Sequence, residues 1–130
     1  MGLLRRLFKS RRYPRFFTHK RAFVVVKSDS LSKKKERTIQ ILDISEGGCA
    51  FIYDGTREEL EESGILSLIA DDNADLDRVD FVTAVDNPIP EPLNDTGLLR
   101  RRGVEFRWLG IFDRQRLKDF IKQNSIGRVP

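Results

Sequence analysis

The chain has 130 residues, a length that suits one ordinary domain with a single core. Hydrophobic residues make up 39% of it, which excludes a disordered chain, and no apolar run is long enough to span a membrane as a helix. The net charge of +4 is unevenly distributed, since region 1–27 holds nine basic residues and no acidic one, whereas 54–95 is mainly acidic. A basic arm ahead of a balanced domain favours an anionic partner, and a solvated basic tail is the alternative.

The first residues and the cysteine content bear on where the protein works. The segment 1–10 has no apolar run followed by a small-residue cleavage site, so it is not a secretory signal. Cys49 is the only cysteine, and no internal disulfide can therefore form. We expect a cytoplasmic protein in a reducing environment.

Six segments have the character of short β-strands, because their apolar and β-branched residues alternate with polar ones or form short apolar runs. In chain order these are 22–27, 38–44, 49–53, 65–70, 79–85 and 102–108. Alternation also predicts the side chains that face the core, which are Ile39, Ile41, Val79, Phe81, Val85, Val104, Phe106 and Trp108. The opposite face of the last strand carries Gly103, Glu105 and Arg107.

The segments between these strands read as turns and loops. Glycines at 47–48 predict a hairpin over 38–53, and the acidic stretch 57–62 predicts a turn or a short helical piece. The stretch 71–77 is rich in Asp and Asn and predicts a loop. Three prolines in 87–93 exclude that segment from the centre of a sheet.

The spacing of apolar residues changes near the end of the chain from the alternation of a strand to the period of a helix. Segment 113–124 therefore predicts a helix with Asp113 as its N-cap. Its apolar stripe of Leu117, Phe120 and Ile121 is narrow, which suits a helix lying on the outside or the mouth of a sheet. Six short strands must close or pair their edges. We therefore predict an all-β fold, a six-stranded antiparallel barrel with one C-terminal helix.

A search for catalytic or metal-binding residues finds little. His19 is the only histidine, and it has no neighbours at the spacing of a metal site. Cys49 and His19 form a conceivable nucleophile and base, but Cys49 lies in an apolar strand, where a buried structural thiol is more common. The sequence has no P-loop and no dinucleotide fingerprint, and 71–77 lacks the glycine and glutamate of a calcium loop. We expect neither an enzyme nor a metal site, and no cofactor.

The first cluster that can bind a ligand is Arg11-Arg12-Tyr13-Pro14-Arg15. An arginine fork can pair bidentately with a phosphate or with the acceptor edge of a guanine. Pro14 stiffens the segment and favours an extended conformation at Tyr13. Taken alone, two arginines four residues apart are weak evidence for a binding site, because the chain is rich in arginine and such a spacing arises by chance.

The second cluster, 43–48, lies at the tip of the predicted hairpin. Asp43 can accept from guanine N1–H and N2–H₂ or orient an arginine, and the Ser45 hydroxyl can donate to a phosphate or carbonyl. Gly47 and Gly48 allow close approach to the backbone. An ordinary turn built from Asp, Ser and Gly is the alternative interpretation of this cluster.

Together the two clusters form a paired signature, R-x-x-x-R before the first strand and D-x-S-x-x-G in the next hairpin, and the sequence thereby resembles the PilZ domain family. Arg11 and Arg15 match the first motif, and Asp43, Ser45 and Gly48 match the second. The strand around RRGVEF and the terminal helix also resemble the end of a PilZ domain, so the resemblance covers about 11–124.

The resemblance implies a PilZ-like barrel that binds cyclic di-GMP, a ligand with two phosphates and two guanines. It assigns Arg11 and Arg15 to phosphates and guanine edges, Asp43 and Ser45 to guanine, and close packing to Gly48. Arg12 and Gly47 lie inside the motifs and are candidates for further contacts. The acidic stretch and the proline loop between the fourth and last predicted strands depart from the family pattern. They either shape a surface for a partner or merely extend a loop.

The predicted organisation is a flexible basic segment at 1–10, one PilZ-like domain at 11–124 and a C-terminal tail at 125–130. We expect the ligand to order the arginine arm and so create a surface for an effector protein that the sequence does not identify. Residues 1–9 place leucines and Phe8 at helical spacing among basic residues, which predicts weak contact with an anionic membrane surface. A segment without order, or one ordered only by the ligand, is the favoured alternative, because short isolated helices are marginal in water.

Two other classes of binding protein remain open. One is a PilZ-like adaptor that binds proteins without the nucleotide. The other is a small basic barrel that binds single-stranded nucleic acid through stacking aromatics and a charged groove. Since most aromatics fall in the inward phase of strands, and the barrel beyond the arm is not basic, the receptor reading is favoured and no binding to DNA is expected.

Overall fold

A computed structural model describes residues 13–28, 35–71, 73–90, 93 and 97–130. The basic segment 1–10 and the first arginines of the motif, Arg11 and Arg12, lie outside the described residues. No helix in the described part of the chain is long and apolar enough to cross a bilayer.

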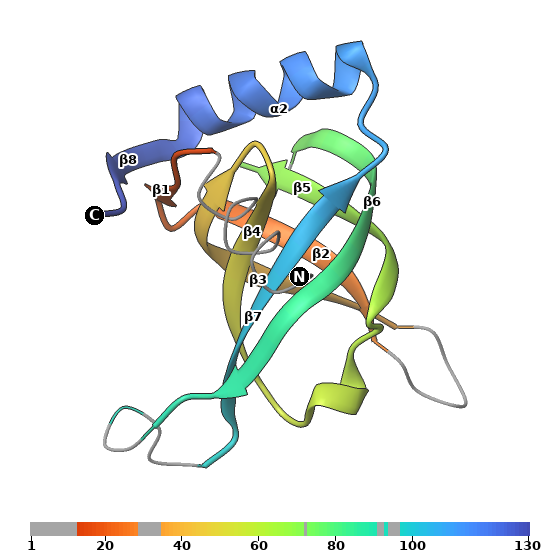
Figure 1. The fold of residues 1–130 in the computed structure, drawn as a ribbon, viewed down its shortest axis with the longest axis vertical. Coiled ribbons are helices and arrows are strands. Elements are labelled where there is room, and N and C mark those ends of the chain that lie inside the picture. Colours follow the sequence, from red (N-terminus) through yellow and green to blue (C-terminus); the bar gives the residue numbers. More distant parts are fainter. Residues whose placement is uncertain (1–12, 29–34, 72, 91–92, 94–96) are drawn as a thin grey trace, which may run out of the picture.

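The centre of the molecule is a closed six-stranded antiparallel β-barrel, which confirms the predicted fold class (Figure 1). Its strands follow the order β2-β5-β6-β7-β4-β3, and pairing of β3 with β2 closes the ring. Closure removes the free edges that strands of this length would otherwise expose. The strands are β2 (Ala22–Ser28), β3 (Lys35–Ser45), β4 (Gly48–Asp54), β5 (Ser63–Ala70), β6 (Asn73–Pro88) and β7 (Leu99–Arg107).

Two short strands that the sequence analysis did not predict extend the sheet beyond β3. Strand β1 (Phe16–Thr18) pairs with the end of β3, and β8 (Ser125–Arg128) pairs with β1. Segments of three and four residues carry too few side chains to show a period of two. The end of the chain therefore packs beside the segment that carries the arginine motif.

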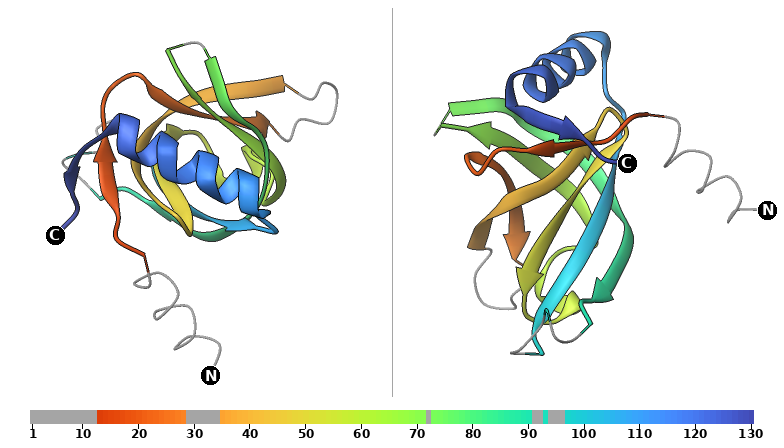
Figure 2. Two further views of the ribbon diagram at one scale, coloured as in Figure 1. Left: turned by 90° about the horizontal axis from the view of Figure 1, so that it is seen from above. Right: turned by 90° about the vertical axis from the view of Figure 1, so that its left-hand side faces the viewer.

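The helix α2 (Ile111–Asn124) lies across one end of the barrel, as the view from above shows (Figure 2). Its predicted stripe of Leu117, Phe120 and Ile121 is buried and joins a core contributed by all six barrel strands. The prediction of Asp113 as N-cap was wrong, because the helix begins two residues earlier, after Gly110. The periodic stripe starts only at Leu117 and carries no information on the first turn.

Two predictions on the strands also need correction. The stretch predicted as a loop at 71–77 is largely strand, because Ala70 and Asn73 pair directly across a tight turn in which Asp71 has a φ of 50°. Aspartate tolerates this left-handed conformation better than most residues. By contrast, the predicted short helical piece is confirmed as the 3-10 helix η1 (Arg57–Glu59).

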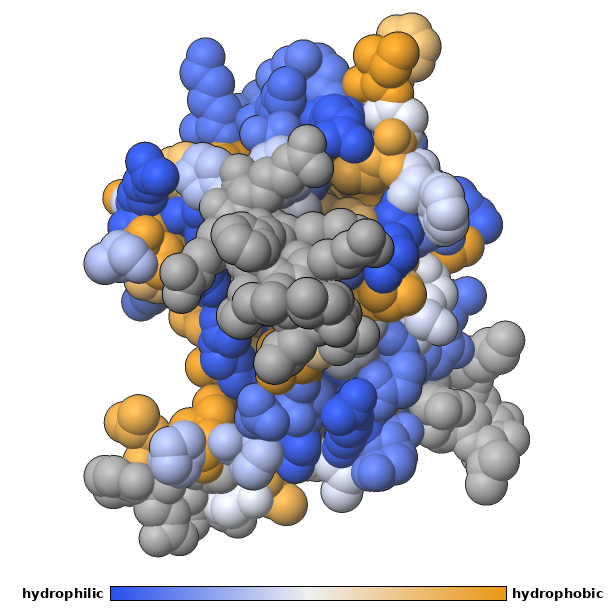
Figure 3. Space-filling model, in the orientation of Figure 1, coloured by the Kyte–Doolittle hydropathy of each residue, from blue (hydrophilic) through white to orange (hydrophobic). Residues whose placement is uncertain are grey.

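Two residues predicted to face the core lie on the surface instead. Val85 is 40% exposed because a register shift between Thr83 and Val85 reverses the alternation of β6. Trp108 is 86% exposed because β7 ends at Arg107 and the next residue turns away with a φ of 57°. The face of the molecule in Figure 3 is mainly hydrophilic, with apolar atoms gathered beside the N-terminal end of α2.

Candidate functional site

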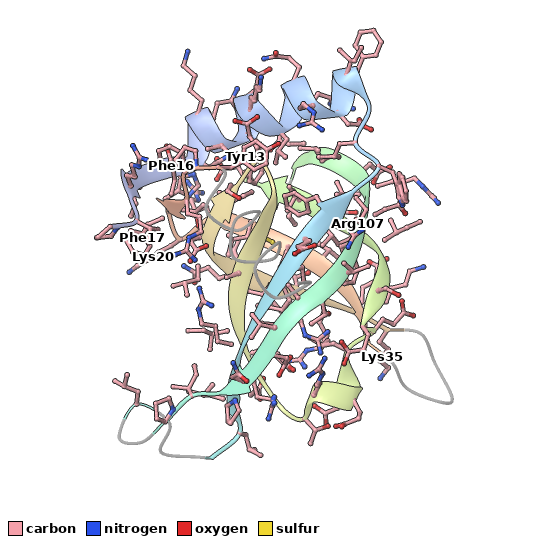
Figure 4. All side chains as sticks on the ribbon, viewed as in Figure 1. Tyr13, Phe16, Phe17, Lys20, Lys35 and Arg107 are labelled. Carbon is pink, nitrogen blue, oxygen red and sulfur yellow. The ribbon has the colours of Figure 1, made fainter. Side chains whose placement is uncertain are left out.

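A cleft of about 310 Å³ lies on the outer face of the barrel, over β3, β4 and β7. Its walls are the segment Tyr13–Arg15, the β3–β4 hairpin, the second half of β7 and two residues of β6. This volume is at the lower end of the range for sites that bind small molecules. In Figure 4, Tyr13 lies at the tip of the β3–β4 hairpin and Arg107 near the C-terminal end of β7.

Arg15 is brought to the cleft by the two short strands. Strand β1 pairs with β3 in the register Phe16 to Ile44, so the residue before it lies beside the end of β3. The backbone N–H of Val129, just after β8, donates to the Arg15 carbonyl at 2.9 Å. The Arg15 side chain is exposed and lines the cleft. Its backbone is therefore held while its guanidinium remains accessible to a ligand.

Asp43 faces the cleft because of an irregularity in β3. Residues Ile39 and Ile41 point into the core, and the same alternation would send Asp43 inward. A register shift between Ile41 and Asp43 reverses the phase, so that Ile44 enters the core and Asp43 turns outward. Asp43 is only 4% exposed at the floor of the cleft, and Arg101 Nη2 lies 3.2 Å from its Oδ2.

Ser45 shapes the turn of the β3–β4 hairpin. Its Oγ accepts from the Gly47 N–H at 3.1 Å and lies 3.5 Å from the Gly48 carbonyl oxygen. This arrangement matches the ordinary turn chemistry considered above, and the hydroxyl also lines the cleft. Ser45 thus has a structural partner while presenting its oxygen to the cavity.

The two glycines of the hairpin have different neighbours. A Cβ on Gly48 would lie 1.9 Å from the Val104 carbonyl oxygen, so the close approach at this position is that of β7. A Cβ on Gly47 would lie 3.0 Å from the Tyr13 ring, which covers the hairpin tip. The Gly47 carbonyl also accepts from the Phe106 N–H at 2.9 Å. These contacts join the hairpin to both other walls of the cleft.

The sequence analysis missed one charged residue of the site, Arg101, and did not assign Glu105 and Arg107 to it. All three line the cleft together with Gly103. The predicted outward phase of 103, 105 and 107 was therefore correct, and extending it backward by two residues would have found Arg101. The signal was present in the alternation, but the strand was predicted to begin at residue 102, three residues after its first residue, Leu99.

The cleft combines three arginines with two carboxylates. Arg107 pairs with Glu105 at 3.4 Å and Arg101 with Asp43, whereas no described residue forms an ion pair with Arg15. One positive charge thus remains in excess. Planar cationic forks beside a buried carboxylate acceptor suit an anionic ligand that also carries hydrogen-bond donors.

Cys49 and His19, considered above as a nucleophile and base, have separate surroundings. Burial and the negative charge of Asp43 raise the pKa of the Cys49 thiol far above its ordinary value. The His19 ring bridges the Asn124 side chain at 2.6 Å and the backbone N–H of Arg21 at 3.0 Å. No metal-binding group of three or more ligands occurs among the described residues.

The sequence matches no family model and no curated protein, but solved structures share its fold. MrkH of K. pneumonia, in complex with cyclic di-GMP, aligns with a TM-score of 0.64 at 18% identity, covering 86% of this chain and 51% of MrkH. The PilZ domain of Escherichia coli YcgR with cyclic di-GMP gives a TM-score of 0.60 at 15% identity, covering 86% of this chain and 88% of that domain.

This chain spans about half the length of MrkH and nearly all of the isolated YcgR domain. The Bacillus subtilis inhibitor of motility MotI is similar to a lesser degree, with a TM-score of 0.50 at 17% identity. At such identities the likeness establishes the fold and leaves ligand and function to be argued from the residues. The protein has a PilZ-like fold.

Proposed function

We propose that this protein is a receptor for cyclic di-GMP, which binds in the cleft between the arginine arm and the β3–β4 hairpin. The observation that carries the proposal is the meeting of Arg15 with Asp43 and Ser45 around one cavity, although about thirty residues separate them in sequence. The solved structures that share the fold include complexes of MrkH and YcgR with cyclic di-GMP, which adds support.

The chemistry of the ligand matches the groups around the cleft. Arg15 supplies a fork for a phosphate or a guanine edge, and Arg101 adds a second cation beside Asp43. The Asp43 carboxylate accepts from guanine N1–H and N2–H₂, and Ser45 offers its hydroxyl. The resemblance to the family motif assigns Arg11 to the same role as Arg15, and Arg12, which lies inside the motif, is a candidate for a further contact.

Calorimetric titration of cyclic di-GMP into the intact protein tests the proposal. We expect saturable binding, weakened by about 30-fold or more in Arg15→Ala, because losing a charge-assisted contact costs about 2 kcal/mol or more. Arg21→Ala is the matched control, since Arg21 is an exposed arginine whose partner is Asp71 rather than a residue of the cleft. We expect that variant to bind like the wild type.

Absence of binding by the intact protein would overturn the receptor proposal. The fold would then serve as a protein adaptor or bind single-stranded nucleic acid, and a salt-dependent binding assay would distinguish the two. The aromatics of the described barrel strands mostly lie in the core, as Phe51, Tyr53 and Phe81 do, which leaves few rings for base stacking.

Signal output is the second part of the proposal. The ligand draws the arm before Phe16 across the cleft, and the rearranged surface recruits an effector protein. Hydrogen exchange of 6–17 with and without cyclic di-GMP tests this step, with greater protection expected in the bound state. Equal protection in both states would contradict the ordering mechanism, whereas the proposal that cyclic di-GMP binds in the cleft would stand.

A further inference from the structure

Three large apolar side chains project from the corner where β7 passes into α2. Trp108, Ile111 and Phe112 are each 86% exposed, and we call this group the apolar corner. The orange surface beside the N-terminal end of α2 in Figure 3 belongs to this region. Large apolar residues within five positions of each other are seldom left so exposed without a function in binding.

The backbone and the packing of this corner force the exposure. Leu109 packs against the core and anchors the segment, whereas Trp108 beside it adopts a φ of 57° that a bulky residue rarely takes. Helix α2 buries Leu117, Phe120 and Ile121, and none of them lies among its first six residues. Its first turn contributes no side chain to the core, and Ile111 and Phe112 remain in solvent.

Basic residues surround the apolar corner. Region 107–118 contains Arg107, Arg114, Arg116 and Lys118, all exposed, against the single acid Asp113. Tryptophan and phenylalanine beside such cations are typical of segments that enter the headgroup region of anionic bilayers. A deformable bilayer can surround side chains that protrude this far, whereas a protein partner would need a preformed pocket for each.

The first residues of the chain join the barrel at the same end. Tyr13 covers Gly47 at the tip of the β3–β4 hairpin, and the adjacent Glu46 lies 3.9 Å from Lys118 of α2. The twelve residues before Tyr13 contain five basic residues and no acidic one. A basic sequence is thus attached at the end of the barrel that carries the apolar corner, and such charge is attracted to anionic lipid.

We propose that the apolar corner is a membrane-surface anchor that inserts Trp108, Ile111 and Phe112 into the headgroup region of an anionic bilayer. The cleft opens beside this anchor, since Arg107 lines the cleft and directly precedes Trp108. Docking therefore places the ligand site next to the membrane. The anchor does not depend on the nucleotide, so it can be tested in its absence.

Trp108 is the only tryptophan of the chain, so its fluorescence reports on the corner alone. The intact protein is titrated with vesicles of phosphatidylcholine containing phosphatidylserine, and with vesicles of phosphatidylcholine only. We expect co-sedimentation and a blue shift of emission with the anionic vesicles, both weakened at high salt. The double variant Ile111→Ser/Phe112→Ser should bind about tenfold more weakly or worse, because it removes two large inserting side chains.

Leu93→Ser is the matched control, because Leu93 is 76% exposed in the loop between β6 and β7, away from α2. We expect it to bind vesicles like the wild type. Vesicle binding without a change in Trp108 emission would mean that another part of the protein contacts the membrane. Failure to bind anionic vesicles would mean that the protein makes no such contact, and either result would overturn the proposal. Self-association lost in the double variant would instead make the corner an interface between copies.

Discussion

Three consecutive arginines on β7 occupy two different environments. Arg100 and Arg102 point to one side of the strand and share the carboxylate of Asp86, whereas Arg101 points to the other side and meets Asp43 in the cleft. The residue types are the same and the positions are adjacent. Comparing the two faces therefore isolates what burial does to an arginine–carboxylate pair.

On the inner face the charges are enclosed. Asp86 is fully buried, with Arg102 Nε at 2.7 Å and Arg100 Nε at 2.5 Å, and the Tyr53 hydroxyl donates to it at 2.5 Å. Burial alone raises the pKa of Asp86, but the hydrogen bonds from Tyr53, Arg102 and Arg100 outweigh it and lower that pKa. Arg102 also donates to two backbone carbonyls around η1, which ties that loop to the barrel.

On the outer face the pair is open. The Arg101 side chain is 38% exposed and reaches Asp43 through one nitrogen at 3.2 Å, so much of its hydrogen-bonding capacity faces the cleft. A satisfied, buried cluster holds the fold, while a looser, half-exposed pair can exchange partners with a ligand. The comparison indicates that the inner arginines are structural and that Arg101 is available for binding.

The largest expected effect comes from Asp86→Asn, which removes the negative charge from the inner face. Arg102 is then left as a buried cation without a counter-ion, which costs about 3–5 kcal/mol in the free energy of unfolding. Urea denaturation at neutral pH measures this loss. A loss of unfolding free energy as small as that measured for exposed ion pairs would contradict this expectation. It would mean that solvent reaches Arg102 and that the inner and outer arginines are equally accessible.

Asp43→Asn sharpens the same comparison from the outer face. Because Arg101 can be solvated when its partner is neutralised, we expect a loss of about 1 kcal/mol or less. Far-ultraviolet circular dichroism checks that both variants retain the fold. Equal destabilisation by the two variants would contradict the division between a structural and an accessible pair.

An intermediate loss of stability is expected from a substitution at Gly48. At this residue the backbone of β4 approaches β7 so closely that a side chain would push the two strands apart. Gly48→Ala places a Cβ against the Val104 carbonyl oxygen, and since backbone cannot yield cheaply, we expect a loss of about 1–3 kcal/mol. Thermal and urea denaturation both report it. Gly47→Ala is the control, because its Cβ meets only the Tyr13 ring and should change stability little.

A dependence of stability on alkaline pH, similar in size to the effect of Asp43→Asn, is expected from Tyr53. Burial and the hydrogen bond to Asp86 raise the pKa of Tyr53 from 10.0 to about 12 in the folded state. A pKa raised by folding gives stability that is complete below pH 10 and is lost as the pH rises towards 12. We expect the stability advantage of the wild type over Tyr53→Phe, about 1 kcal/mol at pH 8, to shrink across that range. Parallel stability curves would contradict this assignment.

Much of the fold was predictable from residue patterns. The alternation of 38–44 and 102–108 and the helical stripe of α2 identified strands, helix and most core residues, because most side chains that face a core are apolar. Errors arose where a local irregularity reversed the pattern, as at Val85 and Trp108. The hairpin around Asp71 was missed because polar residues there suggested a loop.

The sequence by itself determined the fold class, most of the core and the presence of two motifs with the chemistry of an anion site. Only the tertiary structure decided that Arg15 of the first motif lies beside the second motif, because β1 and β8 are too short to leave a periodic signal and yet hold Arg15 beside β3. It also decided that Asp43 faces the cleft, since that depends on a register shift in β3. Burial, which cannot be read from a local sequence pattern, then gave Arg101 a partly exposed environment that differs from those of the arginines on either side of it.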